Sequence, residues 1–315
     1  MERAAPVFAG EARHYTEAAV RPDDVLVYHA AHASALGEWL AGVEAVKVID
    51  YHGITPPEFL RAWQPGLAVA LARGRAELAA LGPGTALGVA HSEFTRRELV
   101  AMGFRDTAAL PILMDAHRLA AAPDPVLLDT LAAGNRGHDW LFVSRLAPNK
   151  RVEDLIKAFC VYRRAWCPAA RLFVVGRPDI PRYARALELF VERLGIEEVH
   201  LMGSVPVDDL AAYYATADVF VCLSEHEGFG VPCLEAMSCG VPVVAFAAGG
   251  LPETVGDGAV VIADKAPEQV AAVVGEVLGD PDLRARLAAA GRGRLAVFAP
   301  DIVGRAWVEL LGGLG

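Results

Sequence analysis

Two carboxylates stand close together in the most informative stretch of the chain. Glu227 lies in a glycine-containing loop after the apolar run Val219–Cys222, and Glu235 lies just over one turn into a helix predicted to begin near Val231. Loop glycines let backbone amides approach a ligand closely, and a helix N-terminus offers free N–H groups, so this position suits a phosphate. Carboxylates accept hydrogen bonds from vicinal hydroxyls. Together these groups fit a sugar nucleotide.

Each glutamate also has a purely structural interpretation. Glu227 could stabilise the dipole of the following helix, and Glu235 could be an exposed helical residue. Taken one at a time, the structural interpretation is the commoner one. The presence of both glutamates beside the loop glycines favours binding.

Two cations occupy a second loop. Arg145 and Lys150 follow the predicted strand Trp140–Ser144 and precede the predicted amphipathic helix Val152–Trp166. Ligands of open α/β sheets bind at the carboxyl ends of strands, so this loop is a binding candidate on topology alone. A solvated pair of loop cations is the alternative.

The elements that must position these loops alternate along the chain. Short β-rich apolar runs alternate with Ala/Leu-rich stretches at helical spacing, which predicts an α/β fold with parallel sheets. The segment before residue 137 is rich in proline and glycine, which predicts turns and a domain boundary there. We expect domains over 1–137 and 138–297, and a C-terminal helix near Ile302–Leu311 that crosses back. The predicted strands are Val25–His29, Val46–Asp50, Ala86–Ala90, Ala108–Leu113, Trp140–Ser144, Arg171–Gly176, Val199–Met202, Val219–Cys222, Val241–Ala245 and Ala259–Ile262.

Composition excludes several classes of protein. The 315 residues are 54% hydrophobic, which is enough for two ordinary domains. A formal charge of -10 argues against a broad cationic face for nucleic acid. Without a signal-like start or an apolar run of about 18–20 residues, we expect a cytoplasmic protein, with peripheral docking at the inner membrane face left open. Five cysteines without a Cys-x-x-Cys predict buried free thiols.

The loop around the two glutamates resembles a known signature. Glu227-Gly-Phe-Gly-Val-Pro-Cys-Leu-Glu235 is similar to the Glu-x7-Glu motif of the family-4 retaining glycosyltransferases, which have the GT-B fold of two Rossmann-like domains facing a cleft. The resemblance covers the chain from about Val25 to its end. Further segments agree in order and spacing: Asp50–Phe59, Ala90–Leu99, Leu110–Asp115, Val143–Lys150, Leu201–Tyr214 and Gly249–Val255.

The resemblance implies a reaction and a role for each site residue. A hexosyl unit would pass from a UDP-, GDP- or dTDP-sugar to a hydroxyl acceptor with retention of configuration and without a metal. Arg145 and Lys150 would neutralise the donor diphosphate, Glu235 would bind the ribose, and Glu227 would contact the transferred sugar or the reacting centre. The backbone around Gly228, Phe229, Gly230 and Val231 would cradle the phosphates, the loop with Gly203, Val205 and Pro206 would meet the base, and His52 would contact the sugar or the acceptor.

The sequence offers two weak candidates for a metal site. His29 and His32 have the i, i+3 spacing of a metal pair, but no third ligand is apparent, so we expect acceptor-side loop residues and no metal. The one Asp-x-Asp string, Asp280-Pro-Asp282, opens the predicted helix Leu283–Ala290 and is interpreted as a helix cap. A structural histidine remains the alternative for His52.

The first domain is where the sequence departs from the family. Residues 1–24 offer at most one helix, near Val7–Val20, in place of the family's opening strand and Gly-rich loop. We therefore expect a shortened N-terminal domain, whose exposed sheet edge a homodimer or a partner protein could cover. The acceptor is expected to be a saccharide or a lipid-linked glycan, as in members that build cell-envelope polysaccharides. A nucleotide-sugar 2-epimerase, a phosphorylase and a binding scaffold without activity of its own are the alternatives.

Overall fold

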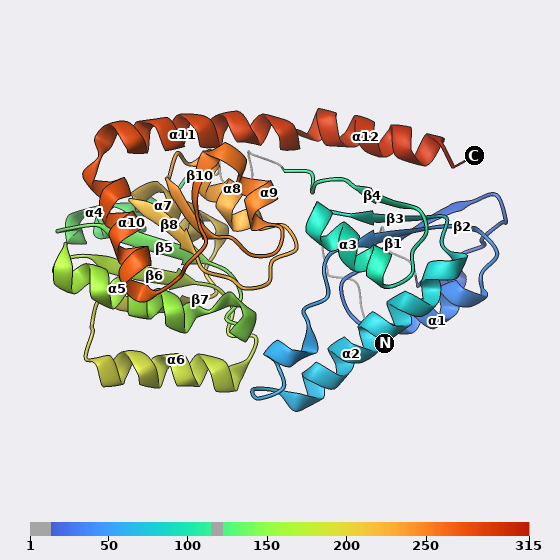
Figure 1. The fold of residues 1–315 in the computed structure, drawn as a ribbon, viewed down its shortest axis with the longest axis horizontal. Helices are drawn as coiled ribbons and strands as arrows, with labels where there is room; N and C mark the ends of the chain where they lie inside the picture. The colour runs from blue at the N-terminus through green and yellow to red at the C-terminus, as the bar shows by residue number, and fades with distance from the viewer. Residues whose placement is uncertain (1–13, 115–121, 315) are drawn as a thin grey trace.

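The computed structural model describes residues 14–114 and 122–314. It holds two parallel β-sheets in two lobes, joined along one side by the helices α11 and α12 (Figure 1). The first sheet has four strands in the order β1-β2-β3-β4, so each helix between them is a crossover to the next strand. Its elements are β1 (Val25–Ala30), α1 (Ala35–Gly42), β2 (Val46–Tyr51), α2 (Pro65–Leu81), β3 (Leu87–Ala90), α3 (Glu93–Ala101) and β4 (Thr107–Ala109).

The second sheet has six parallel strands in the order β10-β9-β8-β5-β6-β7. This is the doubly wound order of a Rossmann-like domain. Its strands are apolar because helices cover both faces, and all four residues of β8 are buried. The elements are α4 (Pro125–Gly134), β5 (Asp139–Val143), α5 (Val152–Ala165), β6 (Arg171–Val175), α6 (Pro181–Leu194), β7 (Val199–Gly203), α7 (Val207–Thr216), β8 (Val219–Cys222), α8 (Val231–Ser238), β9 (Val243–Phe246), α9 (Leu251–Val255), β10 (Ala259–Ile262), α10 (Pro267–Gly279), α11 (Pro281–Leu295) and α12 (Pro300–Gly312).

All ten predicted strands are confirmed, and two of them differ from the prediction by more than one residue at an end. The run Ala108–Leu113 was expected to be one strand, but β4 ends at Ala109, two residues before Pro111. The strand expected from Val241 begins only at Val243, after Pro242. Proline lacks the N–H that a strand donates to its neighbour, which explains both shortened strands.

The segment before residue 137 is not a run of turns, as its composition predicted. It contains α4, with Pro125 in the first turn and Gly134 at the end. The Asp124 side chain caps this helix by accepting a hydrogen bond from the Leu127 N–H at 2.7 Å. Proline and glycine therefore mark the two ends of a helix. Leu131 is buried in the core of the six-stranded sheet, and the domain boundary near residue 137 stays a prediction.

The last two helices run along both lobes. The Asp280 carboxylate caps α11 by accepting from the N–H groups of Asp282 and Leu283, both at 2.9 Å, so its interpretation as a helix cap is confirmed. The following helix, α12, lies along the four-stranded lobe (Figure 1). Its Val303 is buried with Val48 and Val89 of the first sheet.

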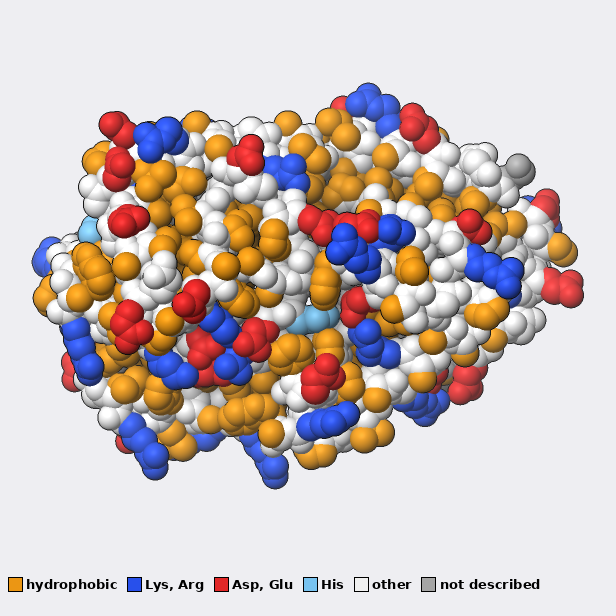
Figure 2. All heavy atoms as spheres, in the orientation of Figure 1, with side chains coloured by type: hydrophobic (Ala, Val, Ile, Leu, Met, Phe, Trp, Pro, Cys, Tyr) orange, Lys and Arg blue, Asp and Glu red, His pale blue; other side chains and the backbone are white. Residues whose placement is uncertain are grey.

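The remaining predictions from the sequence concern the N-terminal segment, membrane-spanning helices, surface charge and the cysteines. Half of the predicted helix Val7–Val20, and Asp115, lie outside the described residues. In the described half, only a short 3-10 turn forms, at Tyr15–Glu17. In the described ranges no helix has the length and apolar character needed to cross a membrane. Acidic and basic side chains are interspersed on the face shown in Figure 2. All five cysteines are free, but Cys239 is exposed, contrary to the expectation of buried thiols.

Candidate active site

The two candidate loops meet where the strand order of the second sheet reverses. The loops after β5 and β8 leave neighbouring strands on opposite sides of this switch point, where open α/β sheets bind their ligands. Two hydrogen bonds join them: the Glu225 N–H donates to the Asn149 backbone carbonyl at 2.9 Å, and the Asn149 side-chain amide donates to the His226 carbonyl at 3.0 Å. The structure therefore brings together the loop that carries Arg145 and Lys150, here called the cation loop, and the loop that carries Glu227, here called the glutamate loop.

Lys150 and Glu227 form a direct ion pair at this junction. The Lys150 ammonium donates to Glu227 Oε1, and the Ser224 hydroxyl donates to the same oxygen at 3.2 Å. Their side chains are only 8% and 14% exposed, so Lys150 is not the solvated loop cation of the alternative interpretation. Arg145 differs, because its guanidinium is 58% exposed and pairs with Asp179 at 3.0 Å.

Glycines let the neighbouring loops approach the Glu227 loop. Gly230 is the N-cap of α8, with φ of 102°. Gly249 has φ of 60°, and a Cβ there would lie 2.4 Å from the Glu227 carbonyl oxygen. The Gly250 N–H donates to that same oxygen at 2.8 Å. Only glycine fits at Gly249, because both its φ and its surroundings exclude a side chain.

Glu235 is buried, which contradicts its interpretation as an exposed helical residue. The Tyr214 hydroxyl, from α7, donates to Glu235 Oε2 at 2.9 Å. Burial and the Glu235 charge raise the pKa of Tyr214 well above its usual range, so Tyr214 stays a hydrogen-bond donor. Sequence reasoning assigned no role to Tyr214, although it stands in the segment that resembles the base-binding loop and its helix.

The predicted base-binding loop lies farther along the same sheet edge. Gly203 ends β7, and Pro206 is the N-cap of α7. Two strand spacings separate β7 from β5, or roughly 10 Å. Val205 is half-buried and Pro206 is exposed. This loop leads directly into the helix that carries Tyr214, so the structure links it to Glu235 through α7.

Phe229 and Val231 lie at the N-terminal end of α8. Phe229 is 6% exposed and packs edge-on against Phe298, with ring centroids 5.4 Å apart. Its ring is therefore part of the core, and only its backbone is available at the entrance to α8. Val231, the first residue of α8, is half-buried.

His52 lies across the domain interface from the glutamate loop. A Cβ on Gly228 would stand 3.2 Å from the His52 carbonyl oxygen, so the two backbones are nearly in contact. His52 and Arg145 both line a cavity of about 490 Å³ with walls from both domains. The other residues lining this cavity include Gly53, Thr55, Gln64, Asn149 and Asp179.

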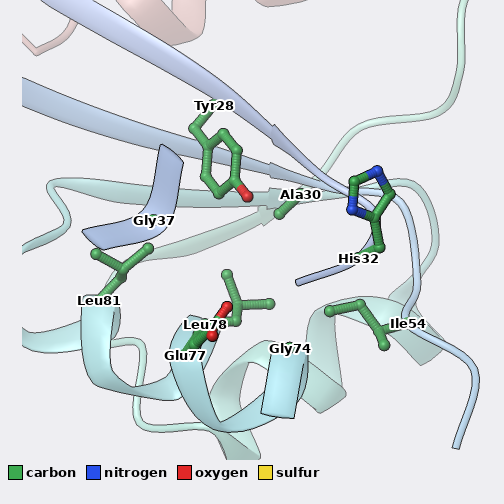
Figure 3. Close-up of a pocket in the computed structure, with 9 residues that line it drawn as sticks. All are labelled: Tyr28, Ala30, His32, Gly37, Ile54, Gly74, Glu77, Leu78 and Leu81. Atoms are coloured by element: carbon green, nitrogen blue, oxygen red, sulfur yellow. The ribbon is translucent and has the colours of Figure 1, made fainter. Parts of the chain in front are cut away.

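His29 and His32 do not form the pair that their spacing suggested. His32 borders a small cavity of about 10 Å³ in the first domain, lined also by Tyr28, Ile54 and Gly74 (Figure 3). His29 instead contacts Asp50 at 2.7 Å and His52 at 3.2 Å. His29, Asp50 and His52 present ligand atoms within 4.8 Å of one another, a grouping that the sequence did not suggest.

Side chains that sequence reasoning missed join the two domains. The Ser92 hydroxyl donates to the Gly228 carbonyl at 2.7 Å. The Glu253 carboxylate, on α9, accepts from the N–H groups of Glu93 and Phe94 at 2.6 and 3.1 Å, and so caps α3 of the other domain. Both residues belong to segments that resemble the family, but the sequence does not reveal that those segments meet.

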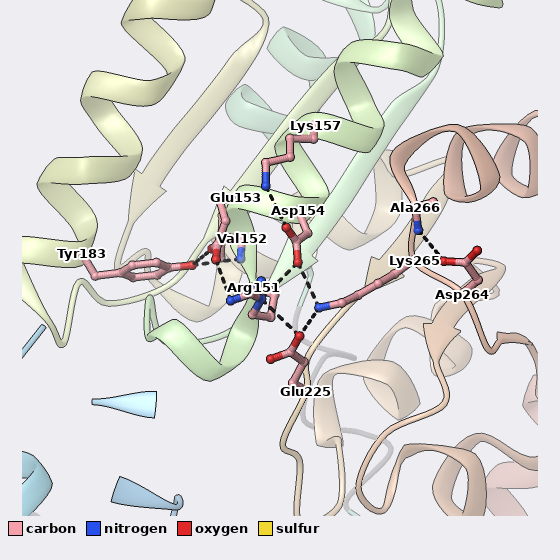
Figure 4. Close-up of polar contacts among 10 residues, drawn as sticks. All are labelled: Arg151, Val152, Glu153, Asp154, Lys157, Tyr183, Glu225, Asp264, Lys265 and Ala266. Atoms are coloured by element: carbon pink, nitrogen blue, oxygen red, sulfur yellow. Dashed lines mark hydrogen bonds and ion pairs between the residues drawn. The ribbon is translucent and has the colours of Figure 1, made fainter. Parts of the chain in front are cut away.

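A network of ion pairs next to Lys150 holds the cation loop in place (Figure 4). Arg151, directly after Lys150, has φ of 53°, the one positive φ among non-glycine residues in the described ranges. Its guanidinium contacts Asp154 at 3.0 Å and Glu225 at 3.4 Å, and the Lys265 ammonium bonds both carboxylates. Burial opposes ionisation of Asp154, but hydrogen bonds from Lys265 and Lys157 outweigh it and lower its pKa to about 2. These charges stabilise the strained Arg151 backbone and tie together the loops after β5, β8 and β10.

Curated relatives are similar to this chain over part of their length. The GDP-mannose-dependent alpha-(1-6)-phosphatidylinositol monomannoside mannosyltransferase of Mycolicibacterium smegmatis is 35% identical over 216 residues, 64% of this chain and 55% of that protein. The D-inositol 3-phosphate glycosyltransferase of Frankia alni is 37% identical over 166 residues, 50% of this chain and 41% of that protein. The chain thus spans about half the length of these relatives.

Solved structures share the fold. Anabaena Alr3699/HepE in complex with UDP and glucose superposes with a TM-score of 0.69 at 24% identity, covering 85% of this chain and 72% of that one. Sucrose-phosphate synthase from Thermosynechococcus elongatus gives a TM-score of 0.71 at 22% identity, covering 88% and 70%. These are GT-B glycosyltransferases, so the predicted α/β fold with two Rossmann-like domains is confirmed. The family model described as Glycosyl transferases group 1 matches residues 132–294, and the chain belongs to this family.

Proposed function

We propose that this chain transfers a hexosyl unit from a nucleoside-diphosphate sugar to a hydroxyl acceptor, with retention of configuration. The observation that carries the proposal is the meeting of the cation loop, the Glu227 loop and the N-terminus of α8 at the switch point, with His52 opposite. Cations and a helix N-terminus suit a diphosphate, and carboxylates suit sugar hydroxyls.

Lys150 and Arg145 are the groups that stabilise the leaving diphosphate. Negative charge grows on the diphosphate as the bond to the sugar breaks, and cations fixed in a poorly solvated site stabilise it. Lys150 is buried and held by Glu227, whereas Arg145 is exposed and held by Asp179. We propose that donor binding draws both cations toward the phosphates and that no metal ion is required there.

Glu235 is the ribose-binding carboxylate in this proposal. Tyr214 occupies one of its oxygens and fixes its orientation. The base would lie near Gly203, Val205 and Pro206, and the phosphates near the backbone of Gly228, Phe229, Gly230 and Val231. This order follows the sheet edge from β7 toward β8.

The reaction proceeds on one face of the sugar. The bond between the anomeric carbon and the diphosphate oxygen breaks, the acceptor oxygen attacks from the same side, and the acceptor proton passes to the departing diphosphate. Glu227 contacts the sugar rather than attacking it, since its Oε1 already accepts hydrogen bonds from Lys150 and Ser224. A double displacement through Glu227 is the competing mechanism, and trapping a glycosylated Glu227 peptide with a slow donor would establish it.

The named relatives suggest which substrates to try first. GDP-mannose is the first donor, with UDP- and dTDP-sugars beside it, and the first acceptors are a phosphatidylinositol mannoside and an inositol phosphate. We further propose that the protein is cytoplasmic and docks peripherally at the membrane when the acceptor is a lipid. Saccharide acceptors of polysaccharide synthesis form the second acceptor class.

The test measures release of nucleoside diphosphate from each donor, with and without acceptor, in the presence of a metal chelator. We expect acceptor-dependent release and, by NMR, a product with the anomeric configuration of the donor. Lys150→Met should abolish most release, whereas Lys47→Met, a matched change at a half-buried lysine on β2 outside these loops, should not. Tight donor binding without release would favour a scaffold, and acceptor-independent change at sugar C2 would favour an epimerase.

A further inference from the structure

Three histidines converge on one buried aspartate at the carboxyl ends of β1, β2 and β3. Asp50 and His29 are register partners on adjacent strands, so their side chains stand on the same face of the sheet. Asp50 Oδ2 lies 2.7 Å from His29 Nδ1 and 3.3 Å from His52 Nε2, and its Oδ1 lies 3.3 Å from His91 Nε2. The Asp50 side chain is only 4% exposed.

This cluster holds a carboxylate without a permanent cation. In the described residues, the ion-pair partners of Asp50 are these histidines, with no lysine or arginine among them. His91 Nδ1 lies 3.1 Å from the Leu110 carbonyl oxygen, which only accepts, so Nδ1 carries the hydrogen. His91 Nε2 and Asp50 Oδ1 are both buried without a hydrogen-bond partner. Because these two atoms face each other at 3.3 Å without a hydrogen bond, His91 does not compensate the charge of the buried carboxylate, and a buried charge of this kind favours a cation beside it.

We propose that His29 Nδ1, Asp50 Oδ2 and His52 Nε2 form a binding site for a divalent transition-metal ion, Zn²⁺ in the first instance. Two imidazoles and a carboxylate are a donor set that such ions favour. Tetrahedral bonds of about 2.0–2.1 Å place ligand atoms about 3.3–3.4 Å apart. The His29–His52 and His52–Asp50 separations are 3.2 and 3.3 Å. Only the His29–Asp50 separation must widen, by about 0.6 Å.

The surroundings fit a three-ligand site with one open position. The second oxygen of Asp50 faces His91 Nε2 at 3.3 Å, which leaves Oδ2 as the oxygen available to the ion. His29 and His52 are 69% and 35% exposed at their side chains, so the ion has access from solvent. His52 also lines the cavity between the domains, so the open position would receive an oxygen of a molecule held there.

The site is separate from the groups proposed to hold the diphosphate. Its ligands all come from the first domain, whereas Arg145, Lys150 and Glu227 come from the second. A metal-free diphosphate site and a metal site on the opposite wall are therefore compatible. The inference does not rest on the proposed transfer, and its test uses binding rather than activity.

The experiment uses the untagged full chain after treatment with a chelator and dialysis. Titration with Co²⁺ should give the visible absorption of a tetrahedral ion, and equilibrium dialysis with Zn²⁺ should give one ion per chain. His29→Ala should weaken Zn²⁺ binding at least about 100-fold, because it removes a ligand at an exposed position that the fold does not need. His32→Ala, at a histidine outside the cluster, should leave the affinity unchanged.

Three results would overturn the assignment. The first is absence of a bound ion at stoichiometric metal. The second is equal affinity in wild type and His29→Ala, or equal loss in His29→Ala and His32→Ala. The third is a thiolate-to-cobalt charge-transfer band, which would assign the binding to the exposed Cys239 instead. Asp50→Asn gives a second ligand variant, and its far-UV circular dichroism shows whether the buried substitution is still folded.

Discussion

Replacing Gly249 by alanine would drive a methyl group into the loop that carries Glu227. The new Cβ would lie 2.4 Å from the Glu227 carbonyl oxygen and 2.9 Å from its nitrogen. An ordinary C···O contact is at least about 3.3 Å, so the loop must retreat by roughly 0.9 Å. The φ of 60° adds about 1–2 kcal/mol of backbone strain for any residue with a side chain.

A shift of this size separates Glu227 from the groups it must act with. Misplacement of a catalytic group by about 1 Å costs on the order of 100-fold in rate. We therefore expect kcat/KM for nucleoside diphosphate release to fall about 100-fold, which corresponds to about 2.7 kcal/mol. The assay is initial-rate release at subsaturating donor, with thermal unfolding measured on the same preparations.

Gly195→Ala is the matched control. Gly195 follows α6 with φ of 62°, and a Cβ there would meet no atom within 4 Å. It carries the same backbone strain without the contact, so it should lose stability but keep its kcat/KM. If Gly249→Ala keeps kcat/KM within twofold and is no less stable than Gly195→Ala, the argument from close approach is refuted.

Three further predictions concern groups around the site. Tyr214→Phe removes a hydrogen bond to the Glu235 carboxylate and should raise KM for the donor about 10-fold with little change in kcat, and a change confined to kcat would contradict the assignment of Glu235 to ribose. Glu253→Ala removes the cap that one domain places on α3 of the other and should lower Tm by roughly 2–4 °C, whereas exposed Glu268→Ala should not; equal shifts would refute the cap. Asp154 has a pKa of about 2 in the folded chain, below its ordinary 3.8, so its charge stabilises the fold above about pH 4 and this contribution is lost as the pH falls toward 2. Urea unfolding of Asp154→Asn should show lower stability than wild type at pH 7 and a narrowing gap below pH 4, and a gap independent of pH would contradict the ion network.

The local features of the fold could be predicted because they depend on short stretches of sequence. Parallel strands appear as short apolar runs. This holds for fully buried strands such as β3 and β8 and for the partly exposed β1, so all ten were found. Helix α4 was missed because its proline and glycine were interpreted as turn residues, although proline in a first turn and glycine at an end are compatible with a helix. The loop after β5 was assigned to the site from the rule that open sheets bind ligands at the carboxyl ends of their strands, but the strand order that places it beside the loop after β8 was not predicted.

Contacts that depend on register or on domain placement could not be predicted. His29 meets Asp50 because the two residues are partners in the β1–β2 register, which the sequence does not specify. Spacing suggested His32 as the partner of His29, but His32 borders a different cavity. Glu253 reaches α3 only because the two domains are docked, and no local pattern encodes that contact.

The position of α12 affects the order in which the chain completes its structure. Val303 and Trp307 of α12 pack against apolar side chains of the first sheet. These side chains, Val48, Leu87 and Val89, precede α12 in the sequence by more than 200 positions. During synthesis from the N-terminus, the six-stranded domain therefore has its whole sequence available before the four-stranded sheet receives its last covering helix. A backbone hydrogen bond from the Met114 N–H to the Phe298 carbonyl, at 3.1 Å, joins the segment after β4 to the chain that returns from the second domain. The four-stranded sheet thus depends on a helix that follows the whole six-stranded domain in the sequence.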